Sequence, residues 1–391
     1  MKPTNESKQQ RGSAGIDGQS LEDFESNLKD NLYVVWNRMS SGCYQPPPVM
    51  RVDIAKSDGG TRQLGIPTVA DRIAQMVVKL SIEPELERHF HEDSYGYRPK
   101  KSAHQALLKA KQRCTQRAWV LDMDIKGFFD TIDHDLLMKA VRRHVKEPWQ
   151  LLYIQRWLMA PVQLRNGLQE ARTIGTPQGG VISPLLANLF LHYTFDLWVE
   201  KQWRGIQFER YADDIVCHCY TEGEAQQLKL MLEARFQSCG LQLHPEKTKI
   251  VYCKGGYNRK KYHKVTFDFL GYTFGPRYMR TRKGVCGLYF VAVISQKKAK
   301  AIRQSINSWP WQFWVHQDIS AIQAHSKSRL QGWLNYYGLF GRSVIRNILF
   351  HFDRKLSRWM KKKFKKARTL IQAAHRVNAM RKAKPYSFSH W

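Results

Sequence analysis

The sequence lacks paired cysteines and long apolar runs. Its seven cysteines are scattered over 391 residues without any C-x-x-C spacing, which argues against a disulfide framework and against a structural zinc site. No uninterrupted apolar run approaches the length that spans a bilayer. The polar N-terminal stretch has no apolar core of the kind that a signal peptide needs. We therefore expect a cytoplasmic protein in a reducing environment.

Acidic residues are also scarce. The chain has 63 Lys and Arg against 33 Asp and Glu, so its formal net charge is +30. From Lys297 to the end, 21 basic residues face two acids, Asp318 and Asp353. Such an excess says little about the fold but indicates a polyanionic partner. Nucleic acid is the first candidate, and an anionic membrane surface is the second.

Hydrophobic periodicity predicts a folded chain of mixed helices and strands. In a helix over 71–86, the apolar residues Ile73, Val77 and Leu80 are expected to face inward. We place the main domain boundary near residue 280, where the sequence turns into basic helices rich in aromatics, and expect the two parts 1–280 and 281–391. The other expected helices cover 21–39, 102–114 and 222–239 and begin at His134 and Pro148; the expected strands cover 49–54, 61–64, 119–125, 206–210, 215–219 and 287–294, with a turn at 57–60.

Two acidic sites carry the chemistry. Asp124 ends an expected strand, and Asp213 and Asp214 lie at the tip of an expected hairpin. If these strands are neighbours in one antiparallel sheet, the three carboxylates converge, and they repel one another unless cations neutralise them. Hard oxygen ligands suit Mg²⁺, and two such ions roughly 3.5–4 Å apart support in-line attack on a phosphate. A buried carboxylate network without metal is the alternative.

The residues around these acids carry a resemblance. Tyr211-Ala212-Asp213-Asp214 matches the Y-x-D-D box of reverse transcriptases, and its context, 208–216, resembles the group II intron-encoded reverse transcriptase/maturase family. The resemblance covers nearly the whole chain, because further blocks follow in that family's order. These blocks are GSAGIDG (12–18), GGTRQLGIPTVADR (59–72), YGYRPKKSAHQAL (95–107), VLDMDIKGFFDTIDHDLL (120–137), GTPQGGVISPLLANLFL (175–191), GLQLHPEKTKI (240–250), FDFLGYTF (267–274) and GWLNYYG (332–338).

The resemblance implies an α+β right-hand polymerase fold. Fingers and palm would be built on an antiparallel sheet with flanking helices, followed by a helical thumb, the maturase domain X. The implied activity is RNA-directed DNA polymerisation, in which dNTPs extend a DNA primer on an RNA template. The implied cofactors are two Mg²⁺ ions, for which Mn²⁺ can substitute. The family also binds group II intron RNA to assist splicing and retromobility. No membrane partner is implied, and the oligomeric state stays open.

The resemblance also implies roles for residues near the acids. Asp124, Asp213 and Asp214 would be catalytic metal ligands, with the backbone carbonyl of Ile125 as a further ligand. Phe129 matches the bulky gate beside the sugar, where a ring would clash with a ribose 2′-hydroxyl and favour dNTP over NTP. Core packing is the alternative for Phe129.

A second group of residues would contact the nucleotide. Lys56 and Arg62 flank the expected turn and would clamp the triphosphate, although exposed hairpin cations usually have no such role. Gln178 and Gly179 match the segment that lies against the nucleotide and the template base, where glycine permits close backbone approach. Lys247 resembles a late palm lysine of undefined role.

The C-terminal part contains a basic amphipathic helix. Leu356, Trp359, Met360 and Phe364 recur at helical spacing, and basic residues occupy the remaining positions. Such a helix can lie on a membrane or along phosphates; its place after the palm and the GWLNYYG match favour a thumb that grips nucleic acid. The expected contacts are Arg358, Lys361, Lys362, Lys363, Lys365 and Lys366.

Departures from the family pattern leave alternatives open. Little sequence precedes the GSAGIDG block, and no Cys-rich His-Asn-His nuclease module follows the thumb, so intrinsic cutting of target DNA is not expected. One alternative is a non-enzymatic RNA-binding splicing factor, against which the intact Asp124, Asp213, Asp214 and Gln178 argue. Another is a freestanding reverse transcriptase used in phage defence or DNA repair. Pro184, after Ser183, argues against the mutagenic retroelement branch.

Overall fold

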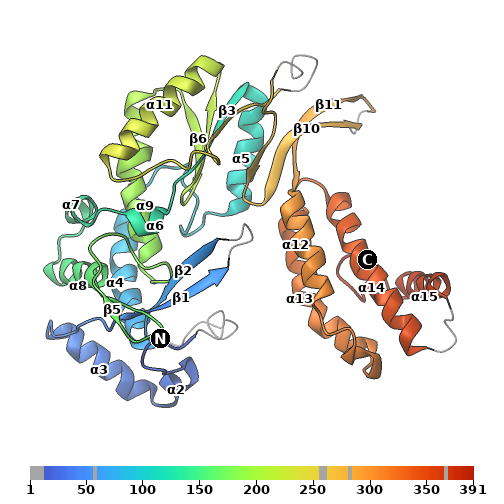
Figure 1. The fold of residues 1–391 in the computed structure, drawn as a ribbon, viewed down its shortest axis with the longest axis horizontal. Helices are drawn as coiled ribbons and strands as arrows, with labels where there is room; N and C mark the ends of the chain where they lie inside the picture. Colours follow the sequence, from blue (N-terminus) through green and yellow to red (C-terminus); the bar gives the residue numbers. More distant parts are fainter. Residues whose placement is uncertain (1–12, 56–59, 255–261, 281–283, 365–368) are drawn as a thin grey trace. The chain divides into compact units, whose positions relative to one another are not determined.

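The computed structural model describes residues 13–55, 60–254, 262–280, 284–364 and 369–391 (Figure 1). It contains helices and antiparallel strands, which confirms the expected α+β class. By packing, the chain forms two compact units, one from Met1–Ala106 with Leu121–Lys249 and the other from Leu107–Val120 with Ile250–Trp391. This division follows contacts, whereas the expected boundary near residue 280 separates parts by role and stays a prediction.

The first unit opens with two helices where one was expected. The interruption lies at Asn27, whose backbone (φ −126°, ψ 46°) leaves the helical region. The side chain of Asn31 donates a hydrogen bond of 3.0 Å to the carbonyl of Phe24, which the interruption leaves without a helical partner. The expectation of a single helix over 21–39 was therefore wrong, because apolar spacing continues through a residue that ends the helix. The two helices are α2 (Leu21–Ser26) and α3 (Leu28–Ser40).

A small sheet follows in the order β2-β1-β4-β5. The expected strand pair forms an antiparallel ladder with Met50 opposite Ile66 and Ala55 opposite Thr61. β1 also pairs in parallel with β4, so residues more than a hundred positions apart share one sheet. Residues 57–59 of the expected turn at 57–60 lie outside the described residues. The strands are β1 (Val49–Ala55), β2 (Thr61–Ile66), β4 (Val162–Gln163) and β5 (Gln169–Glu170).

Helix α4 (Val69–Glu87) exists as expected but turns a different face inward. Val77 and Leu80 are 46% and 48% exposed, so the expected inward face was wrong. The buried side carries Asp71 and Gln75 among its apolar residues. The apolar spacing predicted the wrong inward face because polar residues occupy part of the buried side of the helix. These polar residues form hydrogen bonds with partners far along the chain.

The larger sheet has the strand order β6-β7-β3-β8. Its strands β3 and β7 are buried over almost their whole length, as expected for central strands. The strands are β3 (Trp119–Asp124), β6 (Gln207–Tyr211), β7 (Asp214–Cys219) and β8 (Lys249–Tyr252). The helices between and beside them are α5 (Ala103–Gln116), α6 (Phe128–Thr131), α7 (His134–His144), α8 (Pro148–Met159), α9 (Ser183–Leu191), a π-helical turn (His192–Asp196), α10 (Leu197–Gln202) and α11 (Glu222–Ser238).

The second unit combines a three-stranded sheet, in the order β11-β10-β9, with a helical bundle. Trp309, Leu330 and Phe352 belong to the bundle core. The last residues pack onto this bundle, since Asp353 accepts hydrogen bonds from His390 (2.9 Å) and Trp391 (2.8 Å). The elements are β9 (Phe267–Phe269), β10 (Tyr272–Arg280), β11 (Cys286–Ile294), α12 (Gln296–Asn307), a 3-10 turn (Phe313–His316), α13 (Ile319–Tyr337), α14 (Arg342–Lys363) and α15 (Leu370–Ala383).

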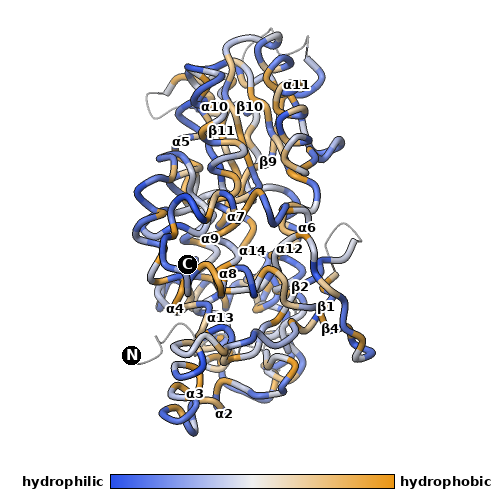
Figure 2. Tube along the Cα trace, turned by 90° about the vertical axis from the view of Figure 1, so that its left-hand side faces the viewer, coloured by the Kyte–Doolittle hydropathy of each residue, from blue (hydrophilic) through white to orange (hydrophobic). Residues whose placement is uncertain are grey.

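Hydrophobic and hydrophilic residues alternate along these helices, as Figure 2 shows. Among the described residues, no helix combines the length and the apolar character that crossing a membrane requires.

Candidate active site

The strand order brings the predicted acids to one place. β3, which ends at Asp124, is a neighbour of β7, which begins at Asp214. Asp213 occupies the two-residue turn between β6 and β7, where Tyr211 pairs with Asp214. The charge of Asp124 raises the pKa of Asp213, so these two carboxylates lie within electrostatic reach of each other. The structure therefore brings at least this part of the predicted trio together.

Burial dominates the electrostatics of Asp213. The pKa of its carboxyl is raised, first by burial and then by Asp124, while backbone hydrogen bonding and the cations Arg62 and Lys247 act in the opposite direction. A half-buried carboxylate beside a second carboxylate favours a cation at this point. Lys247 supplies one, because its ammonium lies 2.9 Å from Oδ2 of Asp124. The family blocks identified Lys247 but left its role undefined, and its distance to Asp124 now defines a place for it.

The donor set suits a hard divalent ion. Carboxylate oxygens are the ligands that Mg²⁺ prefers, and an added cation would relieve the raised pKa of Asp213. As the side chains stand, the described part of the chain contains no group of three His, Cys, Asp or Glu residues with the geometry of a metal site. The residues fit such an ion by their chemistry, and metal binding by the full trio stays a proposal.

Hydrogen bonds on either side of Ile125 fix its backbone. The backbone nitrogen of Lys126 donates to the carbonyl of Gln242 (2.9 Å), and the backbone nitrogen of His244 donates to the carbonyl of Asp124 (2.8 Å). The Ile125 side chain is buried. The chain therefore holds the predicted carbonyl ligand on a paired segment directly after β3.

A buried ion pair lies directly behind the turn. The guanidinium of Arg210 donates to both carboxylate oxygens of Asp196, at 2.7 and 2.6 Å, and neither side chain is exposed. Arg210 also donates to the side-chain oxygen of Asn188 (2.9 Å), and Asn188 donates to the carbonyl of Gly96 (2.7 Å). Asp196 ends the π-helical turn, a local widening that is frequent at functional sites. Sequence reasoning missed this network, although Arg210 lies next to the predicted motif.

Gly96 shows how closely the next segment approaches the turn. A Cβ atom at Gly96 would lie 2.5 Å from the backbone nitrogen of Ala212, so glycine is required here. Ala212 itself has a left-handed backbone with φ 58°, which is uncommon for a residue with a side chain. The YGYRPKK block thus lies against the turn that carries the acids.

Close backbone contacts also position Gln178. Its carbonyl accepts a hydrogen bond of 2.9 Å from the nitrogen of Gly65 in β2. Gly179 has φ 133°, and a Cβ there would lie 2.5 Å from the carbonyl oxygen of Gly65. The two glycines let the loop touch the strand, and the approach of this segment to a nucleotide stays a prediction.

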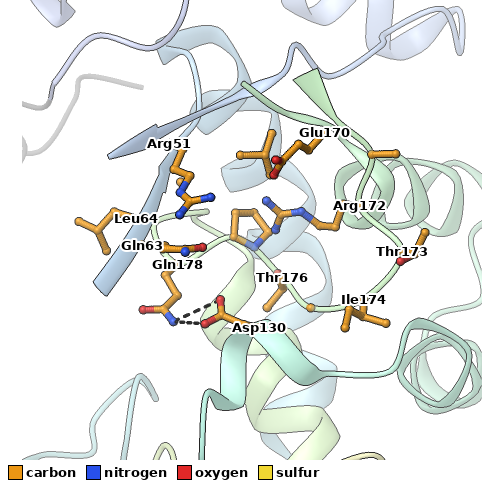
Figure 3. Close-up of a pocket in the computed structure, with 15 residues that line it drawn as sticks. Arg51, Gln63, Leu64, Asp130, Glu170, Arg172, Thr173, Ile174, Thr176 and Gln178 are labelled. Atoms are coloured by element: carbon orange, nitrogen blue, oxygen red, sulfur yellow. Dashed lines mark hydrogen bonds between the residues drawn. The ribbon is translucent and has the colours of Figure 1, made fainter. Parts of the chain in front are cut away.

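The side chain of Gln178 points toward Asp130, and both residues line a pocket of about 210 Å³ (Figure 3). Its nitrogen lies 3.4 and 3.5 Å from the two carboxylate oxygens. Arg51 and Arg172 line the same pocket, and burial lowers the pKa of Arg172 while Asp130 opposes that shift. Sequence reasoning did not single out Asp130 or Arg172, because neither stands out from the family blocks by charge or spacing.

A second buried network fixes the other side of this loop. Asp71 accepts hydrogen bonds from Tyr44 (2.9 Å), Trp157 (2.7 Å) and Gln75 (2.9 Å). The side-chain oxygen of Gln75 then accepts from the backbone nitrogen of Val181 at 2.7 Å. Asp71 of an early block, together with Gln75, therefore helps to position a loop that begins about a hundred residues later.

The structure describes two of the three remaining predicted nucleotide contacts, Phe129 and Arg62. Phe129 is partly exposed, whereas Phe128 is buried, and their rings lie 5.4 Å apart. Arg62 is close enough to lower the pKa of Asp213. Lys56 lies outside the described residues, as do Lys365 and Lys366 among the predicted nucleic-acid contacts.

On the basic helix α14, some of the predicted nucleic-acid contacts are exposed, and one binds other residues of the protein instead. Arg358, Lys361 and Lys362 are exposed. Lys363 instead donates to the carbonyl of Gln317 at 2.6 Å and lies 3.8 Å from Asp318.

The basic cluster on α14 extends to a second helix. The pKa of His351 is lowered by burial and by the positive charges of Lys355, Arg303, Arg354 and Arg358. Arg303, on α12, therefore belongs to the same surface. Sequence reasoning missed it because it lies about forty residues before the start of the basic helix.

Comparisons with known proteins identify the family of this chain. Residues 54–274 match the family described as reverse transcriptase (RNA-dependent DNA polymerase), and residues 299–377 match the group II intron maturase-specific domain. Protein YkfC of Escherichia coli (strain K12) is 32% identical over 345 residues, which cover 78% of this chain and 86% of that protein. The group II intron-encoded protein LtrA of Lactococcus lactis subsp. cremoris is 39% identical over 165 residues, which cover 42% of this chain and 27% of LtrA.

A solved structure shares the fold. Telomerase from Candida albicans, in complex with a TWJ fragment of telomeric RNA, aligns with a TM-score of 0.51 at 11% identity, over 88% of this chain and 64% of that one. The expected polymerase fold and the enzyme class of RNA-directed DNA polymerase are thereby confirmed. The chain belongs to the reverse transcriptase (RNA-dependent DNA polymerase) family and carries a group II intron maturase-specific domain.

Proposed function

We propose that this protein extends a DNA primer on an RNA template by two-metal-ion nucleotidyl transfer, with Asp124, Asp213 and Asp214 as the metal-holding residues. The observation that carries the proposal is the half-buried carboxyl of Asp213, whose pKa is raised by burial and by the charge of Asp124, although two cations oppose that shift. Such a site favours a bound cation and lies at a strand turn with the Y-x-D-D sequence.

The side chains around the acids then have separate roles in the proposed reaction. Divalent ions bound at the carboxylates would supply Lewis acidity to the primer 3′-hydroxyl and to the leaving pyrophosphate. Arg62 would bind triphosphate oxygens through its guanidinium fork. Phe129 would exclude a ribose 2′-hydroxyl, and the segment of Gln178 and Gly179 would lie against the nucleotide and template base. Lys247, at Asp124, adds a positive charge beside the reacting phosphate.

The second unit supports a role with intron RNA. Residues 299–377 match the maturase-specific domain, and exposed basic residues of α12 and α14 form one surface there. LtrA, which is similar to 42% of this chain, is named as a group II intron-encoded protein. We propose that this surface binds group II intron RNA through its phosphates and so assists splicing and retromobility.

Primer extension tests the polymerase proposal directly. The purified protein should extend a labelled DNA primer on an RNA template when dNTPs and Mg²⁺ are present. Removal of divalent ions with EDTA should stop extension, and Mn²⁺ should restore it. Tight RNA binding without extension in either metal would instead support a non-enzymatic splicing factor.

Replacing Phe129 by alanine is expected to weaken discrimination against NTPs. Loss of the ring removes the steric clash with a 2′-hydroxyl, and shape discrimination of this kind amounts to about 10- to 200-fold. The measurement is the ratio of kcat/KM for dNTP and for NTP on one template. Phe129→Tyr, which keeps the ring, is the control, and an unchanged ratio in Phe129→Ala would reject the gate.

Charge removal on α14 should distinguish exposed lysines from the one used internally. For the double variant Lys361→Ala, Lys362→Ala, we expect weaker RNA binding and a shallower dependence on salt. Each lost phosphate contact lowers the slope of log K against log salt by about 0.7–0.9. Lys363→Ala is the matched control: it should lower thermal stability, because it breaks the bonds to Gln317 and Asp318, and leave the slope nearly unchanged. Equal slopes in wild type and the double variant would remove these lysines from the interface.

A further inference from the structure

The segment from Tyr95 to Lys101 contains two residues with strained backbones. Tyr97 has φ 56° and Lys100 has φ 60°, so both adopt the left-handed region that residues with side chains rarely occupy. Such residues persist where the surrounding structure holds them in place, and they gather at functional sites. The strain therefore calls for a reason at each position.

Buried neighbours hold the segment. The backbone nitrogen of Tyr95 donates to the carbonyl of Arg210 (2.8 Å), and its hydroxyl donates to Asp93 (2.9 Å). Arg98 is buried and donates to the carbonyl of Ser94 (2.7 Å) and to the carboxylate of Glu87. These contacts explain why the segment has one conformation, and none of them uses the side chain of Tyr97.

Tyr97 is presented to solvent beside the turn that carries the acids. Its side chain is 55% exposed, and its ring centroid lies 6.5 Å from that of Tyr211. The preceding residue, Gly96, lies against the backbone of Ala212. A strained backbone thus displays a large aromatic ring next to Tyr211, at the base of the turn that carries Asp213, although folding gains little from a ring that remains mostly in water.

The ligand class follows from what must bind at this place. If Asp213 acts in nucleotidyl transfer, as proposed above, the 3′ end of the primer has to reach its carboxylate. An exposed ring beside that point can pack against a sugar and base without reading sequence. Lys100, exposed in the same segment, offers a cation for a backbone phosphate.

We propose that Tyr97, next to Tyr211, contacts the sugar and base of the terminal nucleotide of the primer and so holds the primer end at the acids. This inference rests on the proposed polymerase function. The inference differs from that proposed function because it concerns binding of the primer end, which can be measured without any chemistry.

Three substitutions separate a ligand contact from a structural role. Tyr97→Phe keeps the ring and Tyr97→Ala removes it. Tyr97→Gly removes the ring and also relieves the strain of the left-handed backbone. Tyr220→Ala is the control, because Tyr220 is 62% exposed at the other end of β7 from the turn. For each variant the Kd for an annealed DNA primer and RNA template is measured by fluorescence anisotropy in the presence of EDTA, together with the melting temperature.

We expect Tyr97→Ala and Tyr97→Gly to raise the Kd about tenfold, within the range for loss of an aromatic contact to a base. Tyr97→Phe and Tyr220→Ala should bind as the wild type does. Tyr97→Gly should melt no lower than the wild type, since its backbone strain is relieved. Wild-type affinity in Tyr97→Ala would overturn the proposal. So would recovery of affinity in Tyr97→Gly, because that result would assign the ring a purely structural role.

A failure of the polymerase function gives a different pattern. If the protein does not extend primers, wild type and all variants lack extension, but the comparison of Kd values still decides whether Tyr97 contacts the duplex. If extension occurs and Tyr97→Ala changes only the KM for dNTP, the ring contacts the incoming nucleotide, and the assignment to the primer end is wrong.

Discussion

Asp213→Asn is expected to abolish primer extension and, at the same time, to stabilise the metal-free protein. Loss of a metal-holding carboxylate removes several kcal/mol of transition-state stabilisation, which corresponds to a fall in kcat of roughly 10³-fold or more. Binding of template and primer should change little, because asparagine has nearly the same shape as aspartate.

The stability gain follows from the raised pKa of Asp213. The unfolded carboxyl titrates near 3.8, and burial together with Asp124 moves its titration in the folded chain to higher pH. Between these two values the native state binds more protons than the unfolded state, so stability falls as the pH rises through this window. Above both pKa values the native chain carries the whole penalty, and Asn removes it. Below the unfolded pKa both states are protonated, and the difference disappears.

Melting curves at neutral and acidic pH, with and without Mg²⁺, measure both effects. Mg²⁺ should raise the melting temperature of the wild type by mass action and leave that of Asp213→Asn almost unchanged. Asp135→Asn, which changes an exposed acid on α7, is the control for the loss of one charge. Continued polymerisation by Asp213→Asn, or an Mg²⁺-induced shift as large as in the wild type, would refute the metal assignment.

Local patterns were enough to predict the acid-bearing elements. Asp124 follows a run of buried strand residues, and Asp213 and Asp214 interrupt two such runs, so strand ends and a tight turn could be expected from the chain itself. That β3 and β7 are neighbours did not follow from spacing. It came from the resemblance, because strand order depends on contacts between distant residues.

The supports of the site could not be predicted in the same way. Asp71 and Arg210 are residue types that usually lie at the surface. Both are buried here because residues elsewhere in the chain form hydrogen bonds with their side chains. The same cause turned α4 away from its expected face. Lys363 shows the reverse case: a helical pattern marks it as one more exposed cation, whereas a neighbouring carbonyl and Asp318 hold it within the unit.

The second large effect is expected from Asp196→Ala. It would leave the fully buried guanidinium of Arg210 without its counter-charge, and breaking a buried pair from one side costs about 3–5 kcal/mol. Burial acts to raise the pKa of Asp196, but the charge and hydrogen bonds of Arg210 prevail and lower it below 3.8. The stability from this pair is therefore present above the unfolded pKa and is lost as the pH falls through the folded pKa.

Removing both charges separates stability from positioning. The double variant Arg210→Met, Asp196→Leu leaves no buried charge unpaired, so its free energy of unfolding should recover most of the loss. Urea unfolding of the wild type, Asp196→Ala and the double variant measures this recovery. A double variant that is no more stable than Asp196→Ala would show that the pair stabilises the fold directly.

The double variant should fold and still polymerise slowly. Arg210 joins Asp196 to Asn188, and Asn188 holds the carbonyl of Gly96, which lies against Ala212 in the turn. Without these bonds the strained turn loses part of its support, and a carboxylate misplaced by about 1 Å costs on the order of 10²-fold in rate. We therefore expect a lower kcat with an almost unchanged Kd for template and primer. A double variant with wild-type kcat would mean that the backbone pairing of β6 and β7 alone positions Asp213.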